Sequence, residues 1–315
     1  MTGPIRQDVD RAGKGPRRTP RRDWGQFLVT RLIQMSGYSA IVFVGLIFFF
    51  LVREGLPAVF QVPLGHLFSV RWYPIEGYFG VLPLITGSLI VTAGAMAVAI
   101  PFGIGTAMFI SEIAPRWARE ILKPLVELLG GLPSVVLGFL GILLLSPFLR
   151  RFLNLPTGLT ALAGSLLLGG IAVPTIVSIA EDALDAVPKA YREAALALGA
   201  TRWQTMWGVT FPAARSGVMT AIMLGIGRAI GETMAVMMVT GNAPVLALRL
   251  ASIVSPVRTM TATIAAEMGE VATGSQHYHV LFFIGMVLFL ISLIVNVIAS
   301  AVVFRQRSRA ERVLS

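Results

Sequence analysis

The sequence predicts an all-α integral membrane protein with about six transmembrane helices, and three observations support this fold class. Of the 315 residues, 55% are apolar and only 13% are charged. The mean hydropathy of +0.77 exceeds what a soluble domain of this length needs for its core. Several stretches also reach the roughly 20 apolar residues with which a helix crosses about 30 Å of hydrocarbon.

Hydropathy places the transmembrane helices and the connections between them. The predicted spans are 33–52, 81–104, 125–149, 157–180, 217–240 and 280–304. Three connections exceed a tight turn: 53–80 and 241–279 on one side of the membrane, and 181–216 on the other. Pro101, Pro133 and Pro174 fall inside predicted spans, where proline removes a backbone donor and kinks a helix.

Charge flanking these spans predicts that both termini are cytoplasmic, because Lys and Arg favour cytoplasmic segments. With that orientation, 19 of the 26 Lys and Arg residues lie inside the cell and Arg228 lies within a span. The six on the outer side are Arg53, Arg71, Arg150, Arg151, Arg249 and Arg258. The net charge of +10 therefore reflects membrane orientation and gives no reason to expect nucleic-acid binding.

The same pattern divides the chain into a transmembrane domain and two tails. Residues 1–32 form a basic cytoplasmic tail whose composition predicts flexibility. Residues 33–306 form the transmembrane domain, including the cytoplasmic loop 181–216, and residues 307–315 form a second basic tail. The chain has no cysteine, which excludes disulfides, thiolate metal sites and cysteine catalysis.

The cytoplasmic loop carries the most specific motif. Glu193, Ala194 and Ala195 precede Gly199, and Pro212 follows Gly199 by 13 positions. This pattern predicts a short apolar helix, a sharp turn at the glycine, and a second short helix that the proline ends. A helical turn beneath the bilayer suits insertion into a groove on another protein, although an amphipathic loop on the inner membrane surface is the simpler alternative.

The motif resembles the cytoplasmic signature loop of ATP-binding-cassette importer permeases, which docks onto an ATPase subunit. Segments 227–236, 132–138 and 258–265 narrow the resemblance to phosphate importers and, among these, to the PstC-type subunit. The likeness covers nearly all of residues 33–306. The coupling residues that it implies are Glu193, Ala194, Ala195, Gly199, Ala200, Trp203 and Pro212.

The resemblance also implies an assembly and a location. The expected fold is that of a type I importer permease in a bacterial inner membrane. The expected partners are a homologous PstA-type permease, two copies of a cytoplasmic ATPase, an extracytoplasmic phosphate-binding protein, phosphate and membrane lipid. None of the three lysines ends a phosphate-binding loop. We therefore expect no enzymatic activity and no cofactor in this chain, with ATP and Mg used by the ATPase subunits.

Two charges in the fifth predicted span need an explanation, because an ionisable group at mid-bilayer costs about 2.5–3.5 kcal/mol. Arg228 and Glu232 are four residues apart, which predicts one shared helix face. Gly227 and Gly231 would let a neighbouring helix approach beside them. Arg228 either offers positive charge to a passing anion or forms a structural ion pair with Glu232.

Weaker candidates complete the analysis. Glu127 near the inner end of the third span either joins this polar network or extends to the membrane interface. His277 and His279 have a metal-like spacing but no third ligand nearby, so a solvated loop is expected. Ser134 lacks the context of a nucleophile. Rival functions are a permease for another oxyanion or polar solute and, more distantly, a membrane enzyme or passive channel.

Overall fold

The computed structural model describes residues 24–314, and it divides the chain into two units, Met1–Phe50 and Leu51–Ser315. Within the described residues, six helical segments are long and apolar enough to cross a membrane, as the sequence predicts. They are Phe27–Gln61, Leu82–Ile113, Ser134–Phe152, Ala161–Asp185, Arg202–Gly231 and Gln276–Ile298. The multi-pass all-α fold is therefore confirmed.

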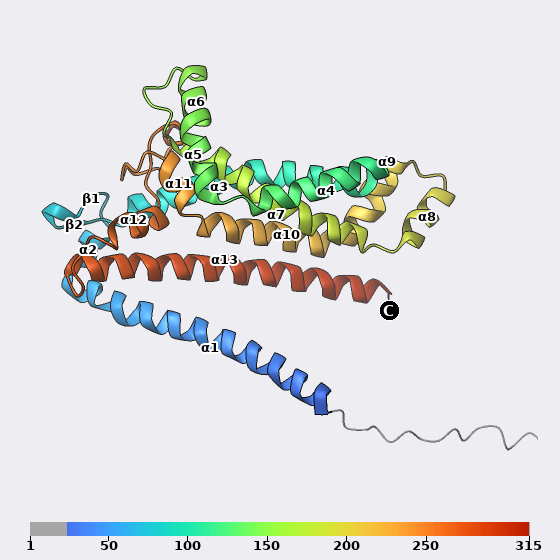
Figure 1. Ribbon diagram of the computed structural model, residues 1–315, viewed down its shortest axis with the longest axis horizontal. Coiled ribbons are helices and arrows are strands. Elements are labelled where there is room, and N and C mark those ends of the chain that lie inside the picture. The colour runs from blue at the N-terminus through green and yellow to red at the C-terminus, as the bar shows by residue number, and fades with distance from the viewer. Residues whose placement is uncertain (1–23, 315) are drawn as a thin grey trace, which may run out of the picture. The chain divides into compact units, whose positions relative to one another are not determined.

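The helices of the described chain differ widely in length (Figure 1). The long helices are α1 (Trp24–Gln61), α3 (Leu82–Met108), α4 (Arg116–Gly131), α7 (Ala161–Asp185), α10 (Phe211–Gly231) and α13 (Gln276–Leu314). The short helices are α2 (Leu64–Leu67), α5 (Ser134–Leu140), α6 (Ser146–Phe152), α8 (Lys189–Ala197), α9 (Arg202–Thr205), α11 (Met234–Val239) and α12 (Met260–Glu267). The strands β1 (Trp72–Tyr73) and β2 (Tyr78–Phe79) form an antiparallel hairpin.

The ends of the chain extend the predicted spans. Helix α1 begins at Trp24, inside the predicted tail 1–32, while residues 1–23 lie outside the described part of the chain. Helix α13 continues to Leu314 and so includes nearly all of the predicted tail 307–315. Both helices extend beyond their predicted apolar spans, because helical hydrogen bonding continues into polar sequence where hydropathy falls.

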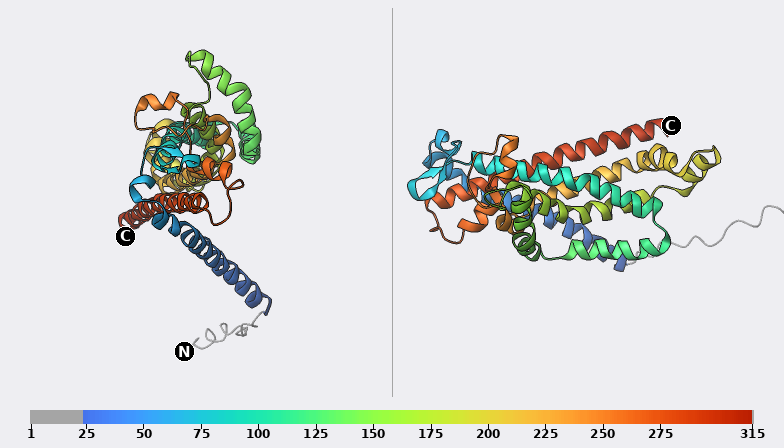
Figure 2. Two further views of the ribbon diagram at one scale, coloured as in Figure 1. Left: turned by 90° about the vertical axis from the view of Figure 1, so that its left-hand side faces the viewer. Right: turned by 90° about the horizontal axis from the view of Figure 1, so that it is seen from above.

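The core of the second unit lies where α3, α7 and α10 run side by side (Figures 1 and 2). Small residues such as Ala99, Ala172 and Ala221 are fully buried along these helices. Ile176 of α7 lies against Gly103 of α3 and Gly225 of α10, where an added Cβ would come within 2.7 and 2.6 Å of the isoleucine side chain, respectively. Close backbone approach of this kind stabilises helix packing in membranes, where apolar contact alone provides little driving force.

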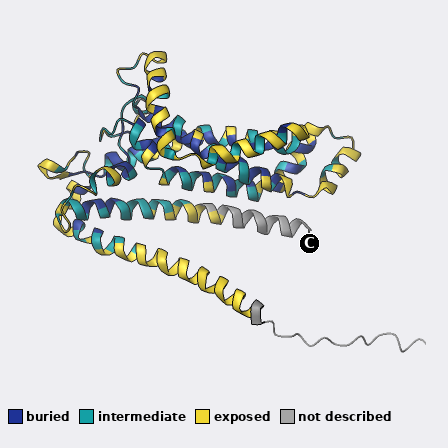
Figure 3. Ribbon diagram, in the orientation of Figure 1, coloured by how far each residue is buried: buried dark blue, intermediate teal, exposed yellow. Residues whose placement is uncertain are grey.

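Burial confirms this arrangement and shows which faces remain uncovered (Figure 3). Helix α7 carries the largest buried share of any candidate span, whereas α5 and α6 expose large side chains such as Phe139, Leu144 and Phe148. In Figures 1 and 2 the segment formed by α5 and α6 leaves the α3–α7–α10 bundle at a steep angle. Its uncovered surface is apolar, as expected for lipid or another membrane subunit.

The third predicted span, 125–149, is not one kinked helix. Helix α4 ends at Gly131, Leu132 and Pro133 are extended, and α5 starts a new helix at Ser134. The proline lacks the N–H that a continuous helix would need, and it disfavours helical conformation at the residue before it. Pro133 therefore separates two helices, while Pro101 and Pro174 lie inside α3 and α7 as predicted.

At the opposite end from α8, a carboxylate joins four separate segments. Glu267 at the end of α12 pairs with Arg258 at 2.7 Å and with His277 at 2.8 Å, and it accepts a hydrogen bond from Nε1 of Trp72 in the hairpin. His279 lies 2.8 Å from the carbonyl oxygen of Glu54. The expectation of a solvated histidine pair is therefore wrong, because both imidazoles lie in the first turns of α13 and contact other segments.

Candidate functional site

Arg228 lies in the last turn of α10, and its guanidinium reaches α7 and the end of α4. Its Nη1 donates to Oγ1 of Thr175 at 2.8 Å, and its Nη2 donates to the carbonyl oxygen of Gly130 at 3.0 Å. Both acceptors are neutral. Among the described side chains, Arg228 forms no ion pair. The site therefore holds a positioned positive charge with no carboxylate to neutralise it.

Glu232 forms no ion pair with Arg228 among the described residues, so the alternative of a structural ion pair is wrong. Helix α10 ends at Gly231, and Glu232 adopts an extended backbone with ψ 126°. Its Oε1 accepts from the backbone N–H groups of Thr233 at 3.1 Å and Ala235 at 3.2 Å. A carboxylate in this position satisfies free N–H groups at the start of a helix and interacts favourably with its dipole. Glu232 therefore starts α11 instead of pairing with Arg228.

Glu232 borders a small cavity that is partly lined by hydroxyl groups. This cavity of about 10 Å³, close to the space that one water needs, is lined by Glu232 together with Ser88, Thr92, Thr259 and Thr261. Thr261 donates to the backbone oxygen of Glu232 at 3.2 Å, and Ser88 accepts from the N–H of Met260 at 2.9 Å. The break between α10 and α11 thus meets a polar lining contributed by α3 and by the start of α12.

The neighbouring predictions have mixed outcomes. Glu127 lies on α4 with an exposed side chain, and within residues 24–314 it makes no hydrogen bond or ion pair. No direct contact among the described residues therefore joins Glu127 to Arg228. Cβ atoms built on Gly227 and Gly231 would have no atom of another described segment within 4 Å, so no described helix packs closely against them. That glycine surface is open beside Arg228.

The cytoplasmic loop has the predicted turn. Helix α8 ends at Ala197, and Gly199 has φ +85°, a left-handed conformation that side chains rarely adopt. In the described part of the chain, no atom beyond the neighbouring residues lies within 4 Å of a Cβ built on Gly199. Within this chain, glycine is therefore required at position 199 for its backbone conformation. Any steric need for glycine there must come from a molecule docked on the loop.

The second helix of the loop does not stop at Pro212. Thr201 and Gln204 form a capping box that starts α9, and the chain continues through a π-helical turn, Met206–Thr210, into α10. Pro212 follows the π-helical turn directly, at the point where the hydrogen-bond pattern of the helix changes; proline cannot donate to the preceding turn, and π-helical turns are one way in which a continuing helix accommodates such a break. One continuous helical segment, Arg202–Gly231, thus connects the loop to Arg228.

The loop exposes several of the predicted coupling residues. Glu193, Ala194 and Gly199 are exposed, Ala195 and Ala200 are half-buried, and Trp203 is 61% exposed. Leu198 next to the turn is 90% exposed. An apolar tip with exposed aromatic and aliphatic side chains is the kind of surface that a protein partner covers.

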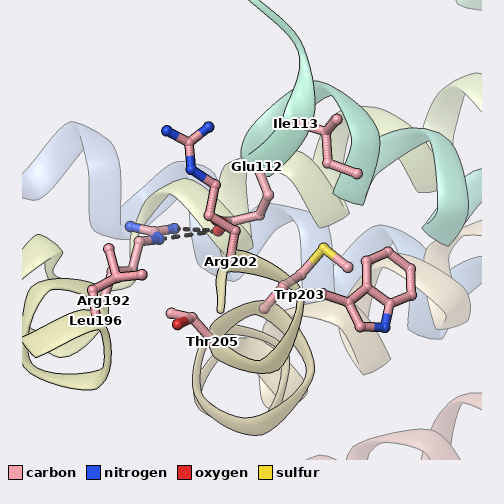
Figure 4. A pocket seen from close by; sticks show the side chains of 8 residues that line it. Glu112, Ile113, Arg192, Leu196, Arg202, Trp203 and Thr205 are labelled. Atoms are coloured by element: carbon pink, nitrogen blue, oxygen red, sulfur yellow. Dashed lines mark hydrogen bonds and ion pairs between the residues drawn. The ribbon is translucent and has the colours of Figure 1, made fainter. Parts of the chain in front are cut away.

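Arg192, which the sequence did not single out, anchors this loop (Figure 4). Its guanidinium pairs with Glu112 at 2.8 Å, just after α3, and donates to the carbonyl oxygens of Leu184 and Val187 at the end of α7. A cavity of about 370 Å³ opens beside the pair, lined among others by Leu196, Trp203 and Met206. Displacement of α8 would therefore pull directly on α3 and α7.

A second ion pair joins α4 to the same end of α7. Nζ of Lys123 lies 2.7 Å from Oε2 of Glu181, which is 2% exposed. The hydrogen bond with Glu181 raises the pKa of Lys123 above its usual 10.5. The amphipathic pattern of α4, with Arg119 and Lys123 one turn apart, is the sequence signal that could have revealed this contact.

Comparison with known proteins identifies the family to which this chain belongs. Residues 99–309 match the model of the binding-protein-dependent transport system inner membrane component. The chain belongs to this family. It is thus the permease component of an ATP-binding-cassette importer and not a catalytic subunit.

Named relatives cover most of this permease. The probable ABC transporter permease protein YqgH of Bacillus subtilis (strain 168) is 44% identical over 232 residues, which are 73% of this chain and 74% of that protein. The phosphate transport system permease protein PstC of Mesorhizobium japonicum is 36% identical over 262 residues, which are 77% and 79% of the two chains.

Solved structures support the fold of this permease. A chain of the inward-facing MetNI methionine ABC transporter aligns with a TM-score of 0.53 at 18% identity, over 72% of this chain and 94% of that chain. A bacterial ABC transporter that imports the acidic polysaccharide alginate aligns with a TM-score of 0.53 at 14% identity, over 88% and 98%. At these identities the likeness confirms the importer permease architecture and nothing finer.

Proposed function

We propose that this permease imports phosphate across a bacterial inner membrane, with Arg228 presenting positive charge to the anion. The observation that carries the proposal is the guanidinium held by two neutral acceptors and left without a carboxylate. A guanidinium matches phosphate oxygens in geometry and keeps its charge throughout the physiological range. Relatives named as phosphate transport permeases support the choice of anion.

The proposed assembly pairs this chain with a homologous PstA-type permease, two cytoplasmic ATPases and an extracytoplasmic phosphate-binding protein. The open glycine surface beside Arg228 is a suitable place for a helix of the second permease. The termini and loop 181–216 face the cytoplasm in this proposal, as the distribution of Lys and Arg favours. ATP and Mg belong to the ATPase subunits.

Coupling follows from the anchoring of the loop. The residues Glu193, Ala194, Ala195, Gly199, Ala200, Trp203 and Pro212 belong to the segment that contacts the ATPase in this proposal. When the ATPases close, α8 moves, and the Arg192–Glu112 pair transmits that displacement to α3 and α7. The helical segment Arg202–Gly231 carries it toward Arg228. Such rigid-body motion fits alternating access around a fixed polar site.

Glu232 has a supporting role in this proposal. Its carboxylate caps α11 beside a hydroxyl-lined cavity, so it fixes the helix break next to Arg228. Glu127 stays a candidate of the substrate pathway in this proposal, because it lies on α4 one turn before Gly130, which accepts a hydrogen bond from Arg228.

Reconstitution tests the proposal. The permease pair, its ATPase and its binding protein in proteoliposomes should show ATP-dependent uptake of labelled phosphate that excess sulfate does not suppress. The alternative function, import of another oxyanion or polar solute, predicts no phosphate uptake or full competition by that solute. Failure of the chain to co-purify with any ATPase would instead favour a membrane enzyme or channel.

A further inference from the structure

A second basic pocket lies away from Arg228, where α6 turns back toward α7. It has a volume of about 330 Å³ and is lined by Ser146, Pro147, Arg150, Arg151, Pro156, Thr157 and Gly158. Neither arginine belongs to the site described above. By the distribution of Lys and Arg, this turn faces the extracytoplasmic side.

The polar side chains that line the pocket can donate hydrogen bonds, and none of them has an acidic partner among the described residues. Arg150 and Arg151 form no ion pair with any side chain that the structure describes, and no Asp or Glu is among the lining residues. Thr157 already accepts the N–H of Leu159 at 3.2 Å, which leaves its hydroxyl hydrogen free to donate. Two arginines and two hydroxyl-bearing residues line one cavity, and their donor groups favour an anion with several acceptor oxygens.

The backbone holds this pocket in a defined shape. The N–H of Leu155 donates to the carbonyl oxygen of Arg150 at 3.0 Å, so the chain folds back directly after α6. Gly158 lies so close to Ser146 that an added Cβ would be 1.8 Å from the serine carbonyl oxygen. Only glycine permits this approach. A pre-formed wall lowers the ordering cost of binding.

We propose that this pocket binds a tetrahedral oxyanion of the phosphate class. Two sources supply that chemistry. One is inorganic phosphate on its way to the transport pathway, and this source rests on the proposed function. The other is the headgroup of an anionic phospholipid, which is independent of the proposed function. Phe148 and Phe152 on α6 stack with ring centroids 5.6 Å apart and are 59% and 72% exposed. Apolar rings that are this exposed suit contact with lipid, and arginines near the end of a spanning helix extend to the membrane interface, so the pocket lies within reach of lipid headgroups.

A single cysteine in this cysteine-free chain reports binding directly. Pro156→Cys places a thiol in the pocket wall, and an uncharged maleimide measures its accessibility in the complex embedded in nanodiscs. Free anion is tested in phosphatidylcholine nanodiscs, with 10 mM inorganic phosphate compared with 10 mM chloride. The lipid headgroup is tested by comparing nanodiscs that contain phosphatidylglycerol with nanodiscs of phosphatidylcholine alone. A cysteine at Ser275, outside the pocket, controls for general effects. Pro147→Cys replaces the probe if Pro156→Cys does not assemble.

Binding should slow labelling of the pocket cysteine about fivefold, and Arg150→Gln with Arg151→Gln should remove that protection, since partly exposed charge pairs contribute about 1 kcal/mol. Protection by inorganic phosphate identifies the free anion, and protection only by phosphatidylglycerol identifies the headgroup. Arg53→Gln with Arg71→Gln removes two other outer charges and should leave protection intact. No protection by either ligand, or equal loss in both double variants, overturns the proposal. Because labelling needs no transport, its result is independent of whether the complex imports phosphate.

Discussion

Two half-buried arginines in this permease differ in their partners. Arg192 pairs with the carboxylate of Glu112 and also bonds two carbonyl oxygens at the end of α7. Arg228 bonds only a hydroxyl and a carbonyl oxygen. Both guanidinium groups are positioned by two elements besides their own, but only the charge of Arg192 is balanced locally.

The difference separates a structural arginine from one that is available to a ligand. A guanidinium that needs only to hold helices together is best served by a carboxylate, because removing a charge from water without a counter-charge is costly. The neutral partners of Arg228 fix its geometry without cancelling its field. That arrangement suits a group that meets its counter-ion only when substrate arrives.

Orientation gives the largest expected contrast, because it decides on which side Arg192 lies. A cysteine at Ser275 should react with an impermeant thiol reagent added outside cells, whereas one at Thr201, near α8, should react only after the cells are opened. The chain has no native cysteine to interfere. Reversed labelling would place the Arg192–Glu112 pair outside the cell, and Arg192 could then have no role in coupling to a cytoplasmic ATPase.

Gly199→Trp should nearly abolish uptake while leaving membrane insertion intact. The left-handed backbone at φ +85° costs a side chain about 1–2 kcal/mol, and the bulk of Trp would fall on the docked ATPase, since nothing in this chain lies nearby. Co-purification of the ATPase measures the effect. Gly199→Asn is the control, because Asn tolerates this conformation and should retain most uptake; equal loss in both variants would mean that the bulk of the Trp side chain is not the cause.

Arg192→Gln should lower uptake about tenfold, which corresponds to about 1.4 kcal/mol of lost coupling. The variant leaves Glu112 half-buried without its partner and frees α8 from α3 and α7. Arg192→Gln together with Glu112→Gln should recover part of the uptake, because neutral side chains can replace the pair. If uptake by the double variant were no higher than uptake by Arg192→Gln alone, the Arg192–Glu112 pair would not act through charge balance.

Thr175→Val should lower uptake by only about threefold, the lower range for loss of one hydrogen bond. The substitution removes one neutral acceptor from Arg228 but keeps its charge and the contact with Gly130. Thr220→Val on α10 is the matched control, since Thr220 bonds only to Ser216 of its own helix. A complete loss of uptake in Thr175→Val alone would mean that Thr175 itself contacts the substrate.

The sequence was sufficient for features that depend on local pattern. Hydropathy gave the right number of spans, although the third begins only at Ser134 and the fifth ends at Gly231. The spacing around Gly199 predicted a helical turn that the structure contains. These features need only the length of apolar runs and the backbone freedom of one glycine.

Features that depend on distant contacts could not be read in this way. The partners of Arg228 lie 53 and 98 residues away in sequence, and nothing in the periodicity of α10 indicates them. The helix break at Glu232 carries no proline, and the sequence interpretation took Gly231, directly before it, as a packing surface and not as a helix end. The break is held by hydrogen bonds from the N–H groups of Thr233 and Ala235 to the Glu232 carboxylate. The i, i+4 rule therefore failed where a side chain formed a cap in place of a pair.

The central claim is that Arg228 supplies a positive charge to phosphate, and initial rates of ATP-driven phosphate uptake in Arg228→Gln and Arg228→Lys proteoliposomes test it most directly. Glutamine keeps hydrogen-bonding capacity and loses the charge, whereas lysine keeps the charge and loses the fork geometry. The account predicts assembled complexes in both cases, a loss of about 30-fold for Gln, consistent with about 2 kcal/mol for a charged hydrogen bond, and a smaller loss for Lys. Uptake by Arg228→Gln equal to or above that of Arg228→Lys would contradict the account.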